Sequence, residues 1–428
     1  MLGRIRYNYK NRYYLNVAFR EDGSSRLASG KKWAFFPSGG ASWSIKDETF
    51  MKGFSWINNL KLRVSYGSVG NTAISPYQTL STLSKQAYLF GESSSDKFYV
   101  YSPSSISNPD LGWEISRTTN LGIDFGFLQS KVNGYIEVYK TKTSDVLMQR
   151  TIPSFTGFIN IWQNIGETET KGLEFNLNYS PIRKKDLDIS LTLNASRSWE
   201  EIKELISGED LPNNKWFIGH PLGVQYDYKK IGIWQLDEAE DAAKYSAVPG
   251  DIKVKDQNND GAISAADDKI ILGQTRPKWL ASLGANITWK CLDFGINLYS
   301  RWGHLIHPSP YNEMVMDGQR WVLDVDYWTP ENPTNDYQSA NQALGYDNYM
   351  GANGYMKGDF IKIQDLTLGY SFEKIVSKFF PIKKFRLYMQ MRNIAYIYKA
   401  AKYDIIPEQP NINYTIPATY NFGVNITF

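Results

Sequence analysis

The residues best suited to metal chemistry form one run, Asp256–Asp267. Residues with side-chain oxygens occupy its positions 1, 3, 5, 9 and 12, which are Asp256, Asn258, Asp260, Ser264 and Asp267. Position 7, Ala262, would supply a main-chain carbonyl. Gly261 at position 6 completes the spacing of a calcium loop. Position 12 is Asp267 in place of glutamate, which leaves bidentate closure open. The pattern predicts a Ca²⁺ site; the alternative is a metal-free turn rich in Asp and Asn.

The other reactive side chains form no recognisable site. His304 and His307 are close in sequence, but zinc needs three or four ligands and no cysteine or third histidine is near. Cys291 is the single cysteine, so an intrachain disulfide is excluded. No P-loop, dinucleotide fingerprint, HExxH or GxSxG occurs, and no carboxylate pair stands out. We therefore expect no catalytic residue and no enzyme.

Tryptophans outside the predicted strands, or at their ends, are candidates for contact with a substrate or a partner protein. A flat ring can cover an apolar face of a sugar or peptide while neighbouring polar groups fix its orientation. The alternative is packing within the loops. The candidates are Trp162, Trp216, Trp234, Trp302, Trp321 and Trp328.

The final residues alternate strictly between large apolar and small or polar side chains. Asn421, Gly423, Asn425 and Thr427 separate the apolar members, which are Tyr420, Phe422, Val424, Ile426 and Phe428. A strand with this pattern has one apolar and one polar face. Taken alone, it fits both the edge of a soluble sandwich and the closing strand of a membrane barrel.

Composition narrows the class of protein. The 428 residues carry a net charge of +3 and 15% aromatic residues, and their mean hydropathy is −0.42. A near-neutral charge argues against a nucleic-acid partner. No run approaches the roughly 18 apolar residues of a helical membrane span, whereas barrel strands are half polar. The strand-like start, Met1–Tyr7, contains no signal peptide, so for a barrel we expect the chain to lack its beginning.

Alternating segments predict about thirteen strands. Short connections at Lys10–Arg12, Gln129–Ser130, Pro181–Lys185 and Lys290–Cys291 alternate with long ones at 71–112, 143–167, 200–274, 303–357 and 396–416. Two connections on the same side as the short turns, 46–59 and 373–384, are longer than the other turns on that side. Bacterial barrels alternate short periplasmic turns and long outer loops in this way. The alternation therefore predicts an all-β antiparallel transmembrane barrel. After Ile363 the apolar residues move from odd-numbered to even-numbered positions, which predicts a β-bulge near Gln364-Asp365.

Several runs resemble signature segments of the SusC/RagA family of TonB-linked outer-membrane importers. They include Phe19–Arg26, Leu60–Asn71, Asn108–Glu114, Thr119–Asp124, Lys171–Glu174, Gly250–Lys253 and Arg392–Ile394. The resemblance covers essentially the whole chain. It implies a plugged 22-stranded barrel that imports oligosaccharides or oligopeptides with a SusD-like surface lipoprotein. No counterpart of the signal peptide, plug, TonB-contacting segment or first strands is present, so residues 1–428 are expected to be a C-terminal portion.

The same resemblance sets the expected location and partners. We expect the C-terminus in the periplasm, the long loops outside the cell, and the 200–274 loop to carry the calcium-like run. Expected partners are outer-membrane lipid, the SusD-like lipoprotein, the barrel assembly machinery through the C-terminal strand, and TonB through the missing N-terminal part.

An odd strand count without a plug predicts that the chain cannot transport alone. One alternative is a secreted all-β glycan-binding protein or adhesin, from which detergent dependence would distinguish a barrel. An extracellular glycan hydrolase is another, and it would need a catalytic carboxylate pair.

Overall fold

The computed structural model describes residues 1–89, 97–206, 208–308, 325–339, 349–372, 382, 384–410 and 416–427. Trp321 and Phe428, both named above as candidates, lie outside these ranges, as does most of the connection 373–384. Within them, no helix has the length and apolarity to cross a membrane.

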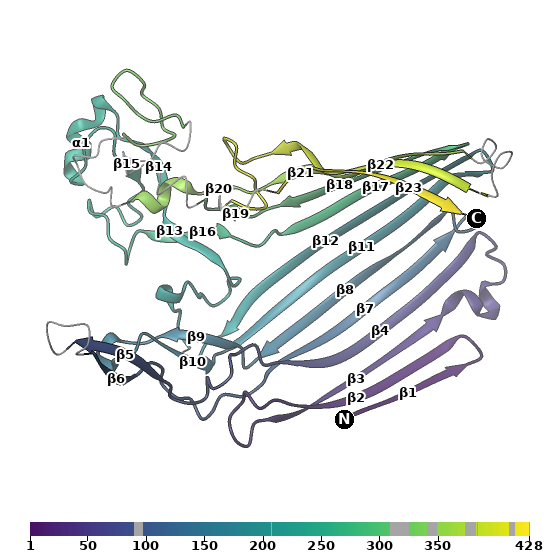
Figure 1. Ribbon diagram of the computed structural model, residues 1–428, viewed down its shortest axis with the longest axis horizontal. Coiled ribbons are helices and arrows are strands. Elements are labelled where there is room, and N and C mark those ends of the chain that lie inside the picture. Colours follow the sequence, from purple (N-terminus) through teal and green to yellow (C-terminus); the bar gives the residue numbers. More distant parts are fainter. Residues whose placement is uncertain are drawn as a thin grey trace. The chain divides into compact units, whose positions relative to one another are not determined.

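The main element is an antiparallel sheet of thirteen strands, which confirms the expected fold class and count. Its order is β1-β2-β3-β4-β7-β8-β11-β12-β17-β18-β21-β22-β23 (Figure 1). The strands are β1 (Leu2–Tyr9), β2 (Tyr13–Gly23), β3 (Trp33–Ser44), β4 (Ile57–Asn71), β7 (Glu114–Phe127), β8 (Val132–Ser144), β11 (Glu167–Lys184), β12 (Leu187–Glu204), β17 (Trp279–Trp289), β18 (Leu292–Trp302), β21 (Phe360–Ser371), β22 (Lys384–Lys399) and β23 (Thr419–Thr427).

The long connections contain small elements that strand counting did not anticipate. Four are two-stranded antiparallel sheets: β5 (Leu83–Leu89) with β6 (Lys97–Pro103), β9 (Leu147–Thr151) with β10 (Asn160–Asn164), β13 (Val224–Tyr228) with β16 (Lys269–Gln274), and β14 (Lys230–Ile233) with β15 (Ile252–Val254). The fifth joins β19 (Leu305–Ile306) to β20 (Met356–Lys357). The loops of the second unit also contain the helix α1 (Ala239–Lys244) and the 3₁₀ turn η7 (Met350–Gly354).

The chain divides into two compact units. The first comprises Met1–Leu177 and Arg197–Leu222. Apart from its strands, it contains two buried loop clusters, Leu27 with Ile74 and Leu111, and Ile165 with Ile202 and Leu205. In its short connection 45–56, Glu48 accepts hydrogen bonds from Tyr13 Oη (2.6 Å) and Trp43 Nε1 (3.0 Å).

The second unit comprises Asn178–Ser196 and Gly223–Phe428. Its buried loop clusters are Ile233, Ile252, Val254, Trp328 and Ala352, and Ile306, Tyr337, Ala401 and Ile405. The predicted bulge is confirmed: Ile363 pairs with Leu298 and Asp365 with Asn297, so Gln364 is the extra residue. One turn was placed too early, because β11 continues through the expected start at Pro181 to Lys184 and β12 begins at Leu187.

The strands of the second unit have two chemically different faces. Across five neighbouring strands the register aligns Ile287, Phe294, Leu368, Met389 and Phe422 in one row. The adjacent row aligns Thr288, Asp293, Gly369, Tyr388 and Gly423. Since successive side chains in a strand point to opposite faces, the first row belongs to an apolar face and the second to a polar face.

Candidate functional site

The polar face of the second unit forms a groove of about 510 Å³. Amide and hydroxyl side chains from β12, β17, β18 and β21 line it, including Thr192, Asn194, Ser282, Asn286, Asn297 and Thr367. Such groups exchange hydrogen bonds with polar solutes and with water. The groove is therefore suited to a polar ligand or a polar protein segment.

One ion pair belongs to the lining of this groove. Arg386 Nε donates to Asp293 Oδ1 at 2.8 Å, and Arg386 Nη2 contacts the other carboxylate oxygen. A two-pronged arrangement of this kind fixes both side chains more firmly than a single contact. Arg386 is on β22 and Asp293 on β18, so the pair spans the intervening strand β21.

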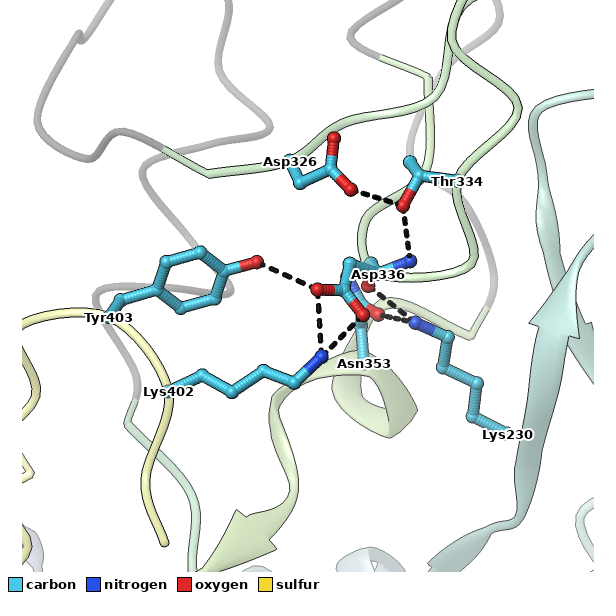
Figure 2. A network of polar contacts seen from close by, with 7 residues as sticks. All are labelled: Lys230, Asp326, Thr334, Asp336, Asn353, Lys402 and Tyr403. Carbon is cyan, nitrogen blue, oxygen red and sulfur yellow. Dashed lines mark hydrogen bonds and ion pairs between the residues drawn. The ribbon is translucent and has the colours of Figure 1, made fainter. Parts of the chain in front are cut away.

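Three long connections meet around Asp336 (Figure 2). From the β22–β23 connection, Lys402 Nζ contacts both carboxylate oxygens of Asp336 at 2.5 and 2.7 Å, and Tyr403 Oη donates to it at 3.3 Å. From β14, Lys230 Nζ donates to the main-chain oxygen of Asp336 at 2.5 Å and to Asn353 Oδ1 at 2.5 Å. The network therefore joins the connections β12–β17, β18–β21 and β22–β23.

Burial and hydrogen bonding shift several pKa values in this network, among them those of Lys230 and Asp326. Burial lowers the pKa of Lys230 to about 8, and the nearby charge of Asp336 only partly offsets this effect. Hydrogen bonds from Thr334 and then Asn332 hold the pKa of the Asp326 carboxyl below its usual value. Lys230 is thus partly neutral near physiological pH, and the neutral amine still has two N–H groups for its two acceptors.

The Asp256–Asp267 loop has the backbone of a tight turn. Asn259 and Gly261 both have left-handed φ values, 59° and 84°, a region that glycine and asparagine tolerate best. Asp256 accepts main-chain hydrogen bonds from Asn259 (2.6 Å) and Gly261 (2.9 Å). Burial raises the pKa of Asp256, but these bonds outweigh it and the net shift is downward.

The carboxylates of this loop do not converge on one point. Asp260 accepts from the main chain of Ala262 (2.8 Å), and Asp267 accepts from Ser264 Oγ (2.8 Å). In the described part of the chain, no three His, Cys, Asp or Glu side chains form a group that could hold a metal ion. The left-handed φ values of Asn259 and Gly261 suit a tight turn of this kind. Calcium binding stays a prediction.

Comparison with known proteins identifies the family to which this sheet belongs. The family model described as "TonB dependent receptor-like, beta-barrel" matches residues 3–394. This chain belongs to that family.

Curated relatives of this receptor family place the chain within larger proteins. TonB-dependent receptor P26 of Formosa agariphila is 30% identical over 461 residues, covering 100% of this chain and 46% of that protein. TonB-dependent receptor SusC of Bacteroides thetaiotaomicron is 29% identical and covers 87% and 38%. The solved RagAB peptide transporter gives a TM-score of 0.82 at 22% identity, covering 100% and 47%. The SusC/RagA resemblance is confirmed, and the chain spans less than half the length of these relatives.

The candidate tryptophans of this receptor chain lie in different surroundings. Trp234 and Trp328 are 6% and 5% exposed, and Trp328 Nε1 donates to Gln235 Oε1 at 2.9 Å. Trp162 and Trp216 pack, partly buried, against the two loop clusters of the first unit. Trp302 stacks on Tyr398 with ring centroids 5.5 Å apart. Packing accounts for Trp234 and Trp328 in this conformation, and ligand contact by any of the five stays a prediction.

The C-terminal strand forms as the alternation predicts. β23 pairs antiparallel with β22, and Tyr420, Phe422, Val424 and Ile426 are exposed. Their pairing partners, including Leu387 and Met389, continue the apolar face. The role of this strand as an assembly signal is untested by the geometry and stays a prediction.

Several charged residues that matter structurally, Asp268, Lys362 and Glu408 among them, were not among the sequence candidates. Asp268 is 1% exposed and accepts main-chain hydrogen bonds from Gln257 and Ser264, each at 2.7 Å. Its position after Asp267, one beyond the calcium spacing, was the available signal. Lys362 and Glu408 form a buried ion pair (2.6 Å), and their sequence separation offered no signal.

Proposed function

We propose that this chain forms the C-terminal part of the barrel of an outer-membrane importer driven through TonB. In this proposal the apolar face meets lipid and the polar face lines the passage through the membrane. The observation that carries it is the pair of rows across β17, β18, β21, β22 and β23, one apolar and one polar. Side chains of the apolar row are exposed, among them Phe294, Leu368 and Phe422, as a lipid-facing surface requires.

The proposed orientation follows from the connections. Barrels of this kind have short turns on the periplasmic side and long loops outside. The connections between β7 and β8 and between β17 and β18 are short, whereas those between β12 and β17 and between β18 and β21 are long and contain further strands. The C-terminus would then be periplasmic, and the Asp336 network would belong to loops exposed to the outside.

The proposed cargo is an oligosaccharide or an oligopeptide, taken up together with a SusD-like surface lipoprotein. Two findings support this class of substrate. The groove of the second unit is lined by amide and hydroxyl groups, which suit polar oligomers. Relatives include SusC, and the structurally similar RagAB is described as a peptide transporter.

The test uses the full-length protein that carries these residues, expressed in a bacterium with an intact TonB system. We expect the protein in the outer-membrane fraction, heat-modifiable on gels and copurifying with a surface lipoprotein. Uptake of labelled oligosaccharides or oligopeptides should stop when a protonophore dissipates the proton-motive force. Recovery as a secreted soluble protein, or uptake that is indifferent to the protonophore, would contradict the proposal.

A further inference from the structure

A buried cluster at the long-loop end of β18, β21 and β22 gathers cations around one carboxylate. Lys362 Nζ contacts Glu408 Oε2 at 2.6 Å, Tyr396 Oη donates to the same oxygen at 3.0 Å, and Arg301 Nη2 lies 3.8 Å from Glu408 Oε1. The side chains of Lys362 and Glu408 are 7% and 9% exposed, while that of Arg301 is 33% exposed. Solvent therefore reaches the cluster on the Arg301 side.

The bulge at Gln364 places Lys362 in this cluster. In a regular strand, Lys362 and Asp365 would point to opposite faces, because they are three residues apart. The extra residue brings both to the polar face, where Lys362 pairs with Tyr299 and Asp365 with Asn297. A buried lysine is costly unless its charge is paired. The bulge thus positions a cation whose stability depends on an anion being present.

Aromatic rings and a second cation surround that anion. Arg301 Nε donates to Tyr299 Oη at 3.0 Å, and its guanidinium lies 5.8 Å from the centre of the Phe360 ring. Tyr396 packs edge-on against Phe360, with ring centroids 5.5 Å apart. Arg301 and Lys362 contribute two positive charges against the one negative charge of Glu408, so the cluster can attract a further anion.

Glu408 belongs to a segment that has other anchors. The segment 400–410, which follows β22, packs through Ala401 and Ile405 into the cluster with Ile306 and Tyr337, and Lys402 binds Asp336. Withdrawal of the Glu408 carboxylate would leave these contacts in place. The cations could then be exposed without unfolding the segment.

We propose that Arg301, Lys362 and Tyr396 form a binding site for a carboxylate group of the transported ligand, and that Glu408 occupies this site as an internal competitor. The inference rests on the proposed importer function and deepens it by naming an acidic ligand. Two sources provide this chemistry: the uronic acids of an oligosaccharide and the carboxylates of an acidic peptide. Either would displace Glu408 from the same donors, with the aromatic rings available to its apolar parts.

The experiment measures equilibrium binding by calorimetry on the purified full-length protein in detergent, so it does not depend on TonB-driven uptake. The probes are trigalacturonate and triglutamate, with maltotriose and trialanine amide as neutral counterparts. We expect Glu408→Gln to tighten binding of at least one acidic probe by about tenfold, because the competing carboxylate is gone. The neutral probes should be unaffected. The responding probe identifies the source of the carboxylate.

Double variants distinguish loss of the proposed binding site from misfolding. Tyr396→Phe and Lys362→Met, each combined with Glu408→Gln, should reverse the gain for the acidic probe. Arg392→Gln removes a cation outside the proposed site, on β22, where it pairs with Asp365 (3.1 Å), and this change should leave the gain intact. Heat-modifiability confirms that each variant is folded. The proposal is overturned if Glu408→Gln binds neither acidic probe more tightly, or tightens neutral and acidic probes alike.

Discussion

Arg386 reaches Asp293 across the full width of strand β21, passing over Gly369. A Cβ atom at residue 369 would lie 2.5 Å from Asp293 Oδ2 and 2.6 Å from Arg386 Nη2, which is too close for both contacts to persist. The missing side chain therefore makes room for the ion pair on the polar face.

Replacing this glycine should weaken the wall of the groove. We expect Gly369→Ala to separate Arg386 from Asp293 and to lower the free energy of unfolding by about 1 kcal/mol. The measurement is thermal unfolding of the full-length protein in detergent. Gly284→Ala is the matched control, since its added Cβ meets no atom closer than 3.9 Å. Equal midpoints for the two variants would show that the close approach is unimportant.

Asp336 should stabilise the contacts that join three loops. Asp336→Ala removes the acceptor of Lys402 and Tyr403. The Lys402 side chain is 60% exposed, so its ion pair contributes at most about 1 kcal/mol, and the Tyr403 hydrogen bond adds about 0.5–1.5 kcal/mol. We expect at least tenfold faster protease cleavage in segments 325–339 and 400–410, with strands β18 and β22 still resistant. Asp241→Asn is the control, because its pair with Lys244 (2.6 Å) lies within helix α1 and joins no two loops. Unchanged cleavage in Asp336→Ala would contradict a shared network.

Lys230 predicts an unusual dependence of loop stability on pH. Its folded pKa of about 8 is below the ordinary value of 10.5, so the folded loops bind fewer protons than the unfolded ones between these values. This destabilisation is complete below about pH 8 and is relieved as pH rises. Burial raises the pKa of Tyr403 to about 12, which opposes the gain above its ordinary value of 10. Resistance to proteinase K should therefore increase from pH 8 to 10, and Lys230→Met should abolish the increase.

The calcium prediction can be separated from the structural role of the same loop. Asp256→Asn combined with Asp260→Asn should remove any protection that Ca²⁺ gives the 200–274 segment against protease. Asp268→Asn should destabilise the loop with and without Ca²⁺, because Asp268 accepts two main-chain hydrogen bonds within it. If Ca²⁺ does not protect the unsubstituted protein against protease, the loop is a metal-free turn.

Strand architecture was predictable because alternation is a local property of the sequence. The alternation of apolar residues alone placed the bulge near Gln364-Asp365, and the long connections were placed within a few residues of the observed strand ends. Lys362 and Glu408 could not be paired in advance, since their contact depends on how segment 400–410 folds back onto the strands. Trp234 and Trp328 carried no local sign of burial either, because their packing partners come from distant parts of the chain.

The last prediction concerns β23, whose two faces should respond differently to charge. Phe422 is 77% exposed on the apolar face, whereas its neighbour Asn421 pairs with Gln390 and points to the polar face. Placing a cation on a lipid-facing position of a barrel costs about 2–4 kcal/mol near the middle of the membrane and less toward its surfaces. We expect Phe422→Arg to reduce the amount of full-length protein in the outer membrane sharply, and Asn421→Arg to have little effect. The measurement is quantitative immunoblotting of outer-membrane fractions with heat-modifiability as the folding readout. Equal loss in both variants would show that β23 does not distinguish lipid from water, and the lipid-facing assignment of this strand would fail.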